Sequence, residues 1–232
     1  MKKVITKLIL VLVICASFVS LANTDALQAK SSSTDSNAAQ SALKKKLKKL
    51  FKSYSKTKKN EWNDYSQFDF DGKMTKEEFN KNYNFYYAYK DINGDGIDEL
   101  LVLEEHLHYG GNIRGNLSIY SYLKGKVKCL TKNGDGTKIY IAGPKGFETQ
   151  LIFADDCKYI YAEYSVDAYE GHLFKLSGKK YKEVANYFDG EGVWYSIYDK
   201  STKKEKDVSE EEFIKFIEKA LKNTCTVDWI EY

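Results

Sequence analysis

The sequence lacks the motifs of several common enzyme classes. It has no G-x-S-x-G nucleophile elbow, no H-E-x-x-H zinc site and no phosphate-binding G-x-x-x-x-G-K-[ST] loop. It has only three histidines, His106, His108 and His172. His106 and His108 have the spacing of one strand face and form a candidate transition-metal pair. No third ligand can be assigned to them, so we interpret both as strand-end or loop residues.

Cysteine is also scarce, and no two cysteines form a C-x-x-C pair. Beyond the N-terminal segment only Cys129, Cys157 and Cys225 remain, which allow at most one bridge and one free thiol in a single chain. The sequence leaves open which two would pair. The alternative is that all three are small, half-buried apolar residues without a redox role.

The chain has no basic excess once its N-terminal segment is removed. Residues 1–22 join a lysine-rich start to an apolar run, which is the pattern of a cleaved signal peptide, and the cut could fall as late as residue 29. Without the three lysines of this segment, the 36 basic residues fall to 33 and equal the 33 acidic ones. We therefore expect a secreted or cell-surface protein with no nucleic-acid partner. A retained anchor is the alternative, although Lys7 and Ser17 shorten the apolar run. Cys15 does not fit a lipoprotein site, because bacterial lipid attachment prefers a small residue just before the cysteine and Ile14 stands there.

A tether and a basic helix are predicted next. Residues 23–40 are mostly small and polar, which indicates a flexible tether before a single domain over residues 41–232. Residues 41–59 place leucines and aromatics at helical spacing, with nine lysines and no acid between Lys44 and Lys59. We expect this helix to pack on the domain by its apolar stripe, with its lysines in solvent. The alternative places the basic helix near an anionic envelope surface.

The rest of the chain predicts an α+β fold with N-terminal helices, an antiparallel β meander of about eight or nine strands and a C-terminal helix. Capping boxes specify two helix starts, at Thr75 with Glu78 and at Ser209 with Glu212. Between them, short aromatic and β-branched runs alternate with Gly, Asp and Asn turns. These turns are too short for helical crossovers, which favours antiparallel neighbours.

The stretch DINGDGIDE, residues 91–99, has the pattern of a calcium-binding loop. Oxygen-bearing side chains fall at Asp91, Asn93, Asp95 and Glu99, and the carbonyl of Ile97 would add a further ligand. Calcium takes six to eight oxygens, and glycine allows the sharp turn between them. The cofactor predicted for this chain is therefore Ca²⁺. The alternative is an ordinary Asn-Gly or Asp-Gly turn with solvated acids.

The loop is not an EF-hand, because Val102 stands where a bidentate Glu is required. With the strand-like ELLVLEE that follows, residues 85–105 resemble the FG-GAP loop of integrin-type repeats. They resemble still more the DxNGDGxxEL segment of uncharacterised exported bacterial proteins. The resemblance implies that Asp91, Asn93, Asp95, Ile97 and Glu99 are ligands and that an antiparallel sheet follows. Only one good copy of the motif is present, so a propeller is not implied.

A second metal site is a weaker candidate. Read as an EF-hand loop, residues 67–78 would offer Asp69, Asp71 and Glu78, but Gln67 occupies the first position. The capping box already accounts for Glu78.

Two functions are consistent with these features. The first is an exported, non-catalytic, calcium-stabilised binding protein, whose ligand would be a glycan, a wall polymer or a protein, with a glycan stacking on Tyr or Trp194. The alternative is a secreted glycoside hydrolase that uses a carboxylate pair. The candidate acids for that pair are Asp155, Asp156, Glu163, Asp167, Glu170, Asp189 and Glu191.

Overall fold

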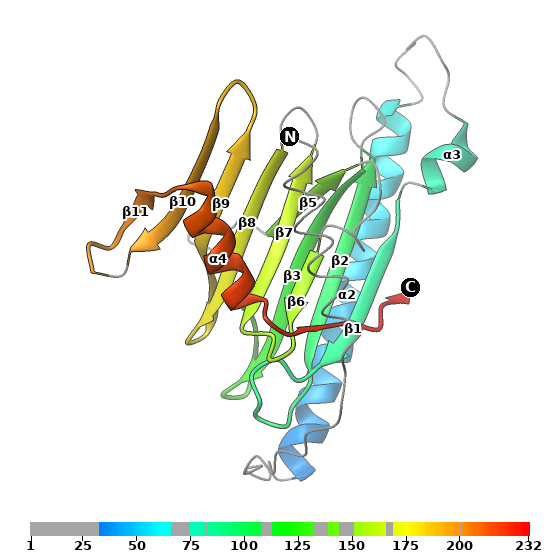
Figure 1. Ribbon diagram of the computed structural model, residues 1–232. Helices are drawn as coiled ribbons and strands as arrows, with labels where there is room; N and C mark the ends of the chain where they lie inside the picture. The colour runs from blue at the N-terminus through cyan, green and yellow to red at the C-terminus, as the bar shows by residue number, and fades with distance from the viewer. Residues whose placement is uncertain are drawn as a thin grey trace.

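A long helix and a large twisted sheet organise the chain (Figure 1). The computed structural model describes residues 33–65, 75–81, 83–107, 113–131, 139–143, 151–165, 169–199 and 201–232. The described helices are α2 (Ser33–Tyr65), α3 (Lys76–Lys81) and α4 (Glu210–Ala220). The described strands are β1 (Phe85–Lys90), β2 (Glu99–Leu107), β3 (Ile113–Leu123), β4 (Lys126–Cys129), β5 (Ile139–Gly143), β6 (Leu151–Ala154), β7 (Tyr159–Ser165), β8 (Tyr169–Ser177), β9 (Lys180–Asp189), β10 (Val193–Asp199), β11 (Lys204–Asp207), β12 (Thr224–Cys225) and β13 (Ile230–Glu231). The predicted signal peptide, residues 1–22, lies outside the described residues.

The sheet has two antiparallel parts. Its main strand order is β11-β10-β9-β8-β7-β5-β3-β2-β1-β13, with β4 beside β3 and with β6 between β7 and β12. The pairings between described strands are antiparallel except that of β5 with β7, which is parallel and rests on one residue pair, Ala142 with Tyr164. One part is therefore built around β1–β3 and the other around β7–β10. The predicted α+β class is confirmed.

The number of strands was predicted too low. Thirteen strands lie within the described residues, against the expected eight or nine. The additional strands are β1, β11, β12 and β13. β1 is a nearly unbroken aromatic run, and the residues of β11, KEKD, are all exposed and charged, so neither shows the alternation of a half-buried strand. β12 and β13 have two residues each and follow α4, so the chain ends on strands and not on a helix.

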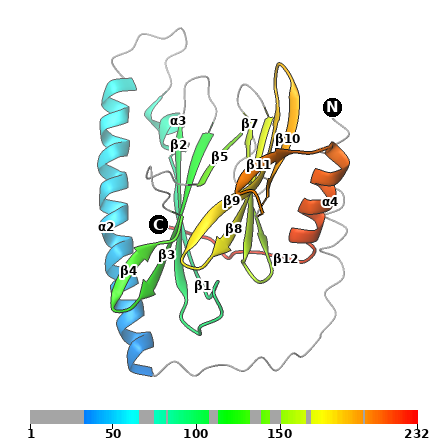
Figure 2. The same ribbon diagram turned by 90° about the vertical axis from the view of Figure 1, so that its left-hand side faces the viewer.

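Three buried clusters arrange these elements in layers (Figure 2). Helix α2 packs with Leu43 and Leu47 on one face of β1–β3. The opposite face of those strands shares a central cluster with β7 and β8, in which Leu103 and Ile160 are fully buried. Helix α4 covers the other face of β7–β10 through Phe213 and Ile217, among others. The two sheet parts therefore lie between α2 and α4, and each part carries one helix on its outer face.

Helix α2 starts earlier than predicted, at Ser33 instead of Ser41, so the later part of the predicted tether is helical. The cause is local: Ala38 and Ala39 favour a helix, and Ala39 is fully buried. The apolar stripe packs on the sheet as expected, and most lysines of the helix are exposed. No helix in the described part of the chain is long and apolar enough to cross a membrane.

Both predicted helix starts are confirmed. The Ser209 side chain accepts from the Glu212 backbone N–H, and the Glu212 carboxylate accepts from the Ser209 backbone N–H. Thr75 and Glu78 make the same reciprocal pair before α3. Each box satisfies backbone donors that a helix start would otherwise leave unpaired.

Candidate functional site

The loop of residues 91–98 connects β1 to β2 and turns its side-chain oxygens back onto its own backbone. The two carboxylate oxygens of Asp91 accept from the backbone N–H groups of Gly94 and Gly96, each at 2.8 Å. The Asn93 Oδ1 accepts from the Asp95 N–H, and the Asp95 Oδ1 accepts from the Ile97 N–H, both at 2.9 Å. The result is one tight curl of alternating acceptor side chains.

Glycine makes this curl possible. Gly94 and Gly96 have φ angles of 75° and 79°, in the left-handed region that side chains with a Cβ rarely adopt. A Cβ on either residue would meet no atom within 4 Å, so the requirement is backbone conformation and not space. The Asn-Gly and Asp-Gly spacing of the sequence therefore determines the shape of the loop.

Glu99, the first residue of β2, anchors the loop through two hydrogen bonds. Its side chain is fully buried, and its two oxygens accept from the Ile92 N–H at 3.0 Å and from the Asn93 Nδ2 at 2.8 Å. Burial and, to a smaller extent, the nearby charges of Asp95 and Asp91 together raise the pKa of Glu99 to about 7. A negative charge at this position is therefore costly unless a positive charge is placed beside it.

The donor set fits a calcium ion in type. Carboxylate and amide oxygens carry two lone pairs each, so an oxygen that accepts one backbone N–H can still bind a cation. Within the described ranges, no three His, Cys, Asp or Glu side chains are arranged to hold a metal. A cation in this loop would therefore need Asn93 and the Ile97 carbonyl in addition to the carboxylates.

The other predicted metal ligands are not brought together by the described residues. Asp69, Asp71 and His108 lie outside them, and Glu78 is bound to Thr75 in the capping box. His106 lies near the end of β2 and packs against the rings of Tyr54 and Tyr83, at centroid distances of 5.3 and 5.6 Å.

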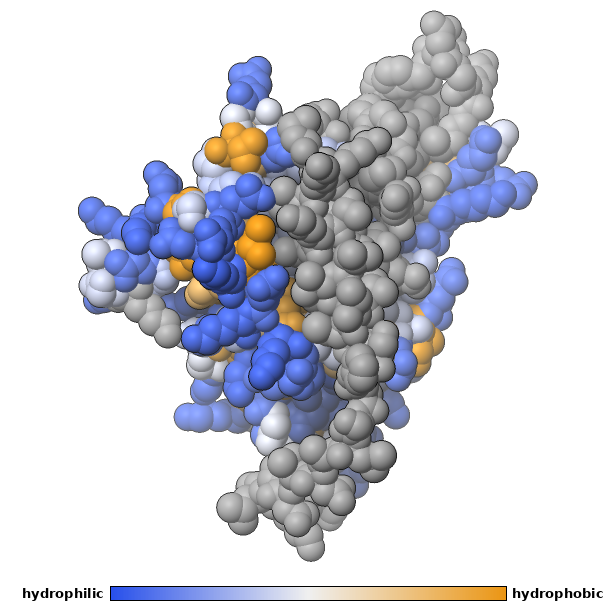
Figure 3. All heavy atoms as spheres, in the orientation of Figure 1, coloured by the Kyte–Doolittle hydropathy of each residue, from blue (hydrophilic) through white to orange (hydrophobic). Residues whose placement is uncertain are grey.

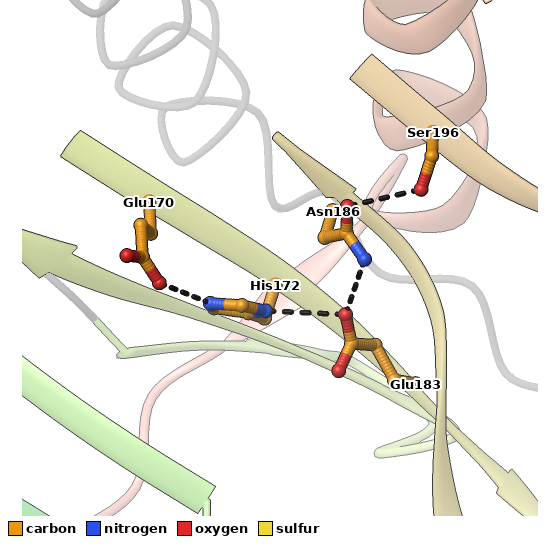
Figure 4. A network of polar contacts seen from close by, with 5 residues as sticks. All are labelled: Glu170, His172, Glu183, Asn186 and Ser196. Carbon is orange, nitrogen blue, oxygen red and sulfur yellow. Dashed lines mark hydrogen bonds and ion pairs between the residues drawn. The ribbon is translucent and has the colours of Figure 1, made fainter. Parts of the chain in front are cut away.

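A second polar cluster lies on strands β8, β9 and β10 (Figure 4). The His172 ring lies between two carboxylates, with Nε2 3.3 Å from Glu170 and Nδ1 3.2 Å from Glu183. The Asn186 amide donates to Glu183 at 2.6 Å and accepts from the Ser196 hydroxyl at 2.9 Å. Of these five residues, sequence reasoning singled out only Glu170 as a functional candidate and did not connect it with His172. The cluster draws on three strands, so no local pattern could have indicated it.

His172 and Glu183 each shift the pKa of the other toward its charged form. Burial opposes a charge on His172, but the hydrogen bonds and charges of Glu183 and Glu170 outweigh it and raise the pKa of the imidazole. Burial likewise opposes a charge on Glu183, and the hydrogen bonds from His172 and Asn186 hold its pKa below its usual range. When the His172 ring is protonated, its two N–H groups therefore donate to carboxyl groups on either side.

Aromatic side chains continue the same face of the sheet. Cross-strand pairing places Glu170, Phe188 and Trp194 in one row, next to the row of His172, Asn186 and Ser196. The rings of Phe188 and Trp194 are stacked, with centroids 5.7 Å apart and an interplanar angle of 16°. Trp194 is 47% exposed. An accessible aromatic surface therefore borders charged hydrogen-bonding groups.

Large apolar areas are not a feature of the view in Figure 3. The described surface seen there is mostly hydrophilic, and its apolar residues form small separate spots.

The acids predicted for a hydrolase are spread over both faces of the sheet. Glu163 lies opposite Gly171 in the pairing of β7 with β8, so its side chain and that of Glu170 point to opposite faces. Glu163 accepts from Tyr161 at 3.1 Å and from Tyr187 at 3.4 Å, and burial raises its pKa. Asp155 and Asp156 are in the β6–β7 turn, Asp189 and Glu191 are at the β9–β10 turn, and Asp167 is outside the described residues.

Comparison with models of known protein families, with curated protein sequences and with solved structures gave no match. The function therefore has to be inferred from the residues and their geometry.

Proposed function

We propose that this chain is an exported, non-catalytic binding protein that is stabilised by calcium in the loop between β1 and β2. The arrangement of that loop carries the proposal. Three side chains, those of Asp91, Asn93 and Asp95, accept backbone hydrogen bonds within a single tight turn, and Glu99 is buried next to it. With the Ile97 carbonyl, they supply the hard oxygen ligands that calcium prefers.

The expected effect of the ion is electrostatic. Asp91 and Asp95 raise the pKa of the buried Glu99, so the negative charges of the loop oppose one another when no cation is present. A bound divalent cation favours the ionised carboxylates and the folded loop together. At a tenfold excess over its dissociation constant, it would add roughly 1.4 kcal/mol to the free energy of unfolding.

Thermal unfolding with calcium and with chelator tests the site. The wild-type protein should melt about 3–6 °C higher in calcium than in chelator, the shift expected for that stabilisation in a domain of this size. Asp91→Ala and Asp95→Ala should abolish the difference. Asp98→Ala is the matched control, because this acid is exposed and outside the predicted ligand set. Equal melting of the wild type under both conditions would reject the calcium site.

For the binding role, we propose a glycan ligand on the face that carries Phe188 and Trp194. A sugar ring presents a C–H face that can stack on an aromatic ring, and its hydroxyls can bond to carboxylates. The Phe188–Trp194 stack and the adjacent Glu170 offer both kinds of contact in one cross-strand row.

Retention on immobilised wall glycans tests this face. Trp194→Ala should weaken retention about five- to 150-fold, because loss of an aromatic stacking partner costs about 1–3 kcal/mol. Tyr169→Ala is a matched control, since Tyr169 is equally exposed at 49% but its side chain lies on the opposite face. Equal loss in both variants, or no retention of the wild type, would contradict a glycan platform at Trp194.

The alternative, a glycoside hydrolase, is supported by one observation. Burial raises the pKa of Glu163, as expected for a general acid, and Asp189 on the same face of the sheet is a candidate second carboxylate. Turnover of a glycoside by the wild type and its loss in Glu163→Gln would establish this activity. Hydrolysis that survives in Glu163→Gln would exclude Glu163 as the acid.

A further inference from the structure

Two cysteines that are far apart in the sequence lie next to each other. Cys157 is buried in the turn between β6 and β7, and Cys225 is half-buried in β12, which pairs with β6. Their sulfur atoms are 3.9 Å apart. Both residues also bond to the carbonyl of Ala154, Cys157 through its backbone N–H at 2.8 Å and Cys225 through Sγ at 3.3 Å. The same short stretch of chain therefore holds both thiols.

The third cysteine cannot replace either of them. Cys129 packs with the α2 cluster on the outer face of β3 and β4, whereas Cys157 and Cys225 belong to the central cluster. Its sulfur lies 3.4 Å from the Thr131 hydroxyl. The sheet separates Cys129 from the other two, so of these three cysteines Cys157 and Cys225 are the two that lie close together.

We propose that Cys157 and Cys225 are a disulfide-forming pair that fastens the C-terminal segment to the β6–β7 turn. A disulfide requires a sulfur separation of about 2.05 Å, so the two sulfurs have to approach by roughly 2 Å. Side-chain rotation can supply much of this movement because Cys225 is not fully buried.

The reaction is a thiol–disulfide exchange with an external disulfide, such as oxidised glutathione or the disulfide of an oxidoreductase. The Cys225 thiolate attacks one sulfur of the external disulfide, forms a mixed disulfide and releases one thiolate. The Cys157 thiolate then attacks Cys225 Sγ and releases the second thiolate. The two cysteines lose two electrons and two protons, and the external disulfide is reduced to two thiols.

The surroundings suit these roles. The hydrogen bond from Cys157 and the positive charge of Lys90 lower the pKa of Cys225, which favours its thiolate as the first nucleophile. The hydrogen bond with Cys225 and burial raise the pKa of Cys157, so this thiol reacts second. The bridge would enclose β7–β11 and α4 in one covalent loop.

Thiol counting and peptide mapping of the full chain test the pairing. After incubation with oxidised glutathione at pH 8, the denatured protein should titrate two fewer thiols than the reduced protein. Its non-reducing digest should contain one peptide pair that links Cys157 to Cys225. The melting temperature should rise by about 10 °C and fall again with a reducing agent, as expected for closing a loop of this length.

Three single variants complete the design. Cys129→Ser should retain the thiol loss and the reducible gain in melting temperature, and Cys157→Ser and Cys225→Ser should lose both. If either of the last two fails to fold, the peptide map of the wild type still decides. An unchanged thiol count, or a linked peptide that contains Cys129, would overturn the proposal.

Discussion

Gly171 shows how a single missing side chain can create a polar site. It lies between Glu163 and Tyr187 in one cross-strand row. A Cβ on Gly171 would lie 2.5 Å from the Tyr161 hydroxyl and 2.7 Å from the Tyr187 Cδ1, closer than real Cβ contacts allow. The glycine thus makes room for the two tyrosines that donate to Glu163.

We predict that Gly171→Ala lowers the free energy of unfolding by about 2–3 kcal/mol, because the added carbon has to displace buried rings. Urea denaturation measures this directly. Gly192→Ala is the control, since a Cβ there would meet no atom within 4 Å, and its effect should stay below about 0.5 kcal/mol. Equal stability of the two variants would contradict the packing around Gly171.

At His172 the prediction concerns pH. The folded protein raises the imidazole pKa, so the stability that the charged ring contributes is fully present below pH 6.5 and is lost as pH rises through the higher folded value. His172→Gln should therefore cost about 1 kcal/mol near pH 5.5 and less near pH 8.5. Partial exposure of all three side chains, at 27%, 35% and 37%, keeps the effect small. The pH dependence of the cost should vanish in a Glu170→Gln, Glu183→Gln background, and its persistence there would exclude the carboxylates as the cause.

At the scale of elements, helix α2 has one face that packs on the sheet and another that carries exposed lysines. Its stripe packs on β1–β3, while seven lysines face solvent: Lys44, Lys45, Lys48, Lys49, Lys52, Lys56 and Lys59. The two other lysines of this stretch serve the fold. The Lys46 ammonium lies 4.5 Å from the centre of the Tyr120 ring, and Lys58 donates to the Tyr83 carbonyl at 3.1 Å. The exposed row can attract an anionic surface without disturbing the packed stripe.

If α2 contacts an anionic wall polymer, replacing Lys44, Lys48 and Lys52 by glutamine should weaken retention on that polymer about tenfold to 150-fold, at about 0.5–1 kcal/mol per lysine. Raising the salt concentration should weaken wild-type retention in the same way. The triple change Lys179→Gln, Lys180→Gln, Lys182→Gln removes the same charge from exposed positions on β9 and its turn and should have little effect. Equal losses in the two triple variants would indicate a response to net charge alone.

Sequence reasoning was most reliable where a structural signal is local. The capping boxes at Thr75 and Ser209 satisfy neighbouring backbone groups, so a few residues determine them. The stripe of α2 follows from helical spacing and was also predicted. β11 was not predicted because all its residues are exposed. A strand that is held only by backbone pairing has no hydrophobic pattern in its sequence.

At the scale of the whole molecule, the candidate sites also differ in whether they are local in the sequence. The loop at residues 91–99 lies in one continuous stretch and could be proposed from spacing alone. The His172 cluster depends on the register of three strands, and the cysteine pair joins positions 68 residues apart. The parallel contact of β5 with β7, through Ala142 and Tyr164, is likewise a product of tertiary packing. Such contacts depend on the register of strand pairing and on how one sheet part packs on the other. Local patterns in a single sequence do not reveal either of these.

The last residues of the chain shield an exposed strand from other molecules. β13 pairs with Tyr86 and Tyr87 of β1, the Tyr232 N–H donates to the Phe85 carbonyl at 3.0 Å, and its ring lies 4.1 Å from that of Phe51. Removing β13 and Tyr232 would leave unpaired backbone groups along the aromatic strand β1. Such an unpaired edge can form hydrogen bonds with a strand of another molecule. Truncated preparations should therefore be prone to self-association, and a purification tag is better placed after the predicted cleavage site and before α2.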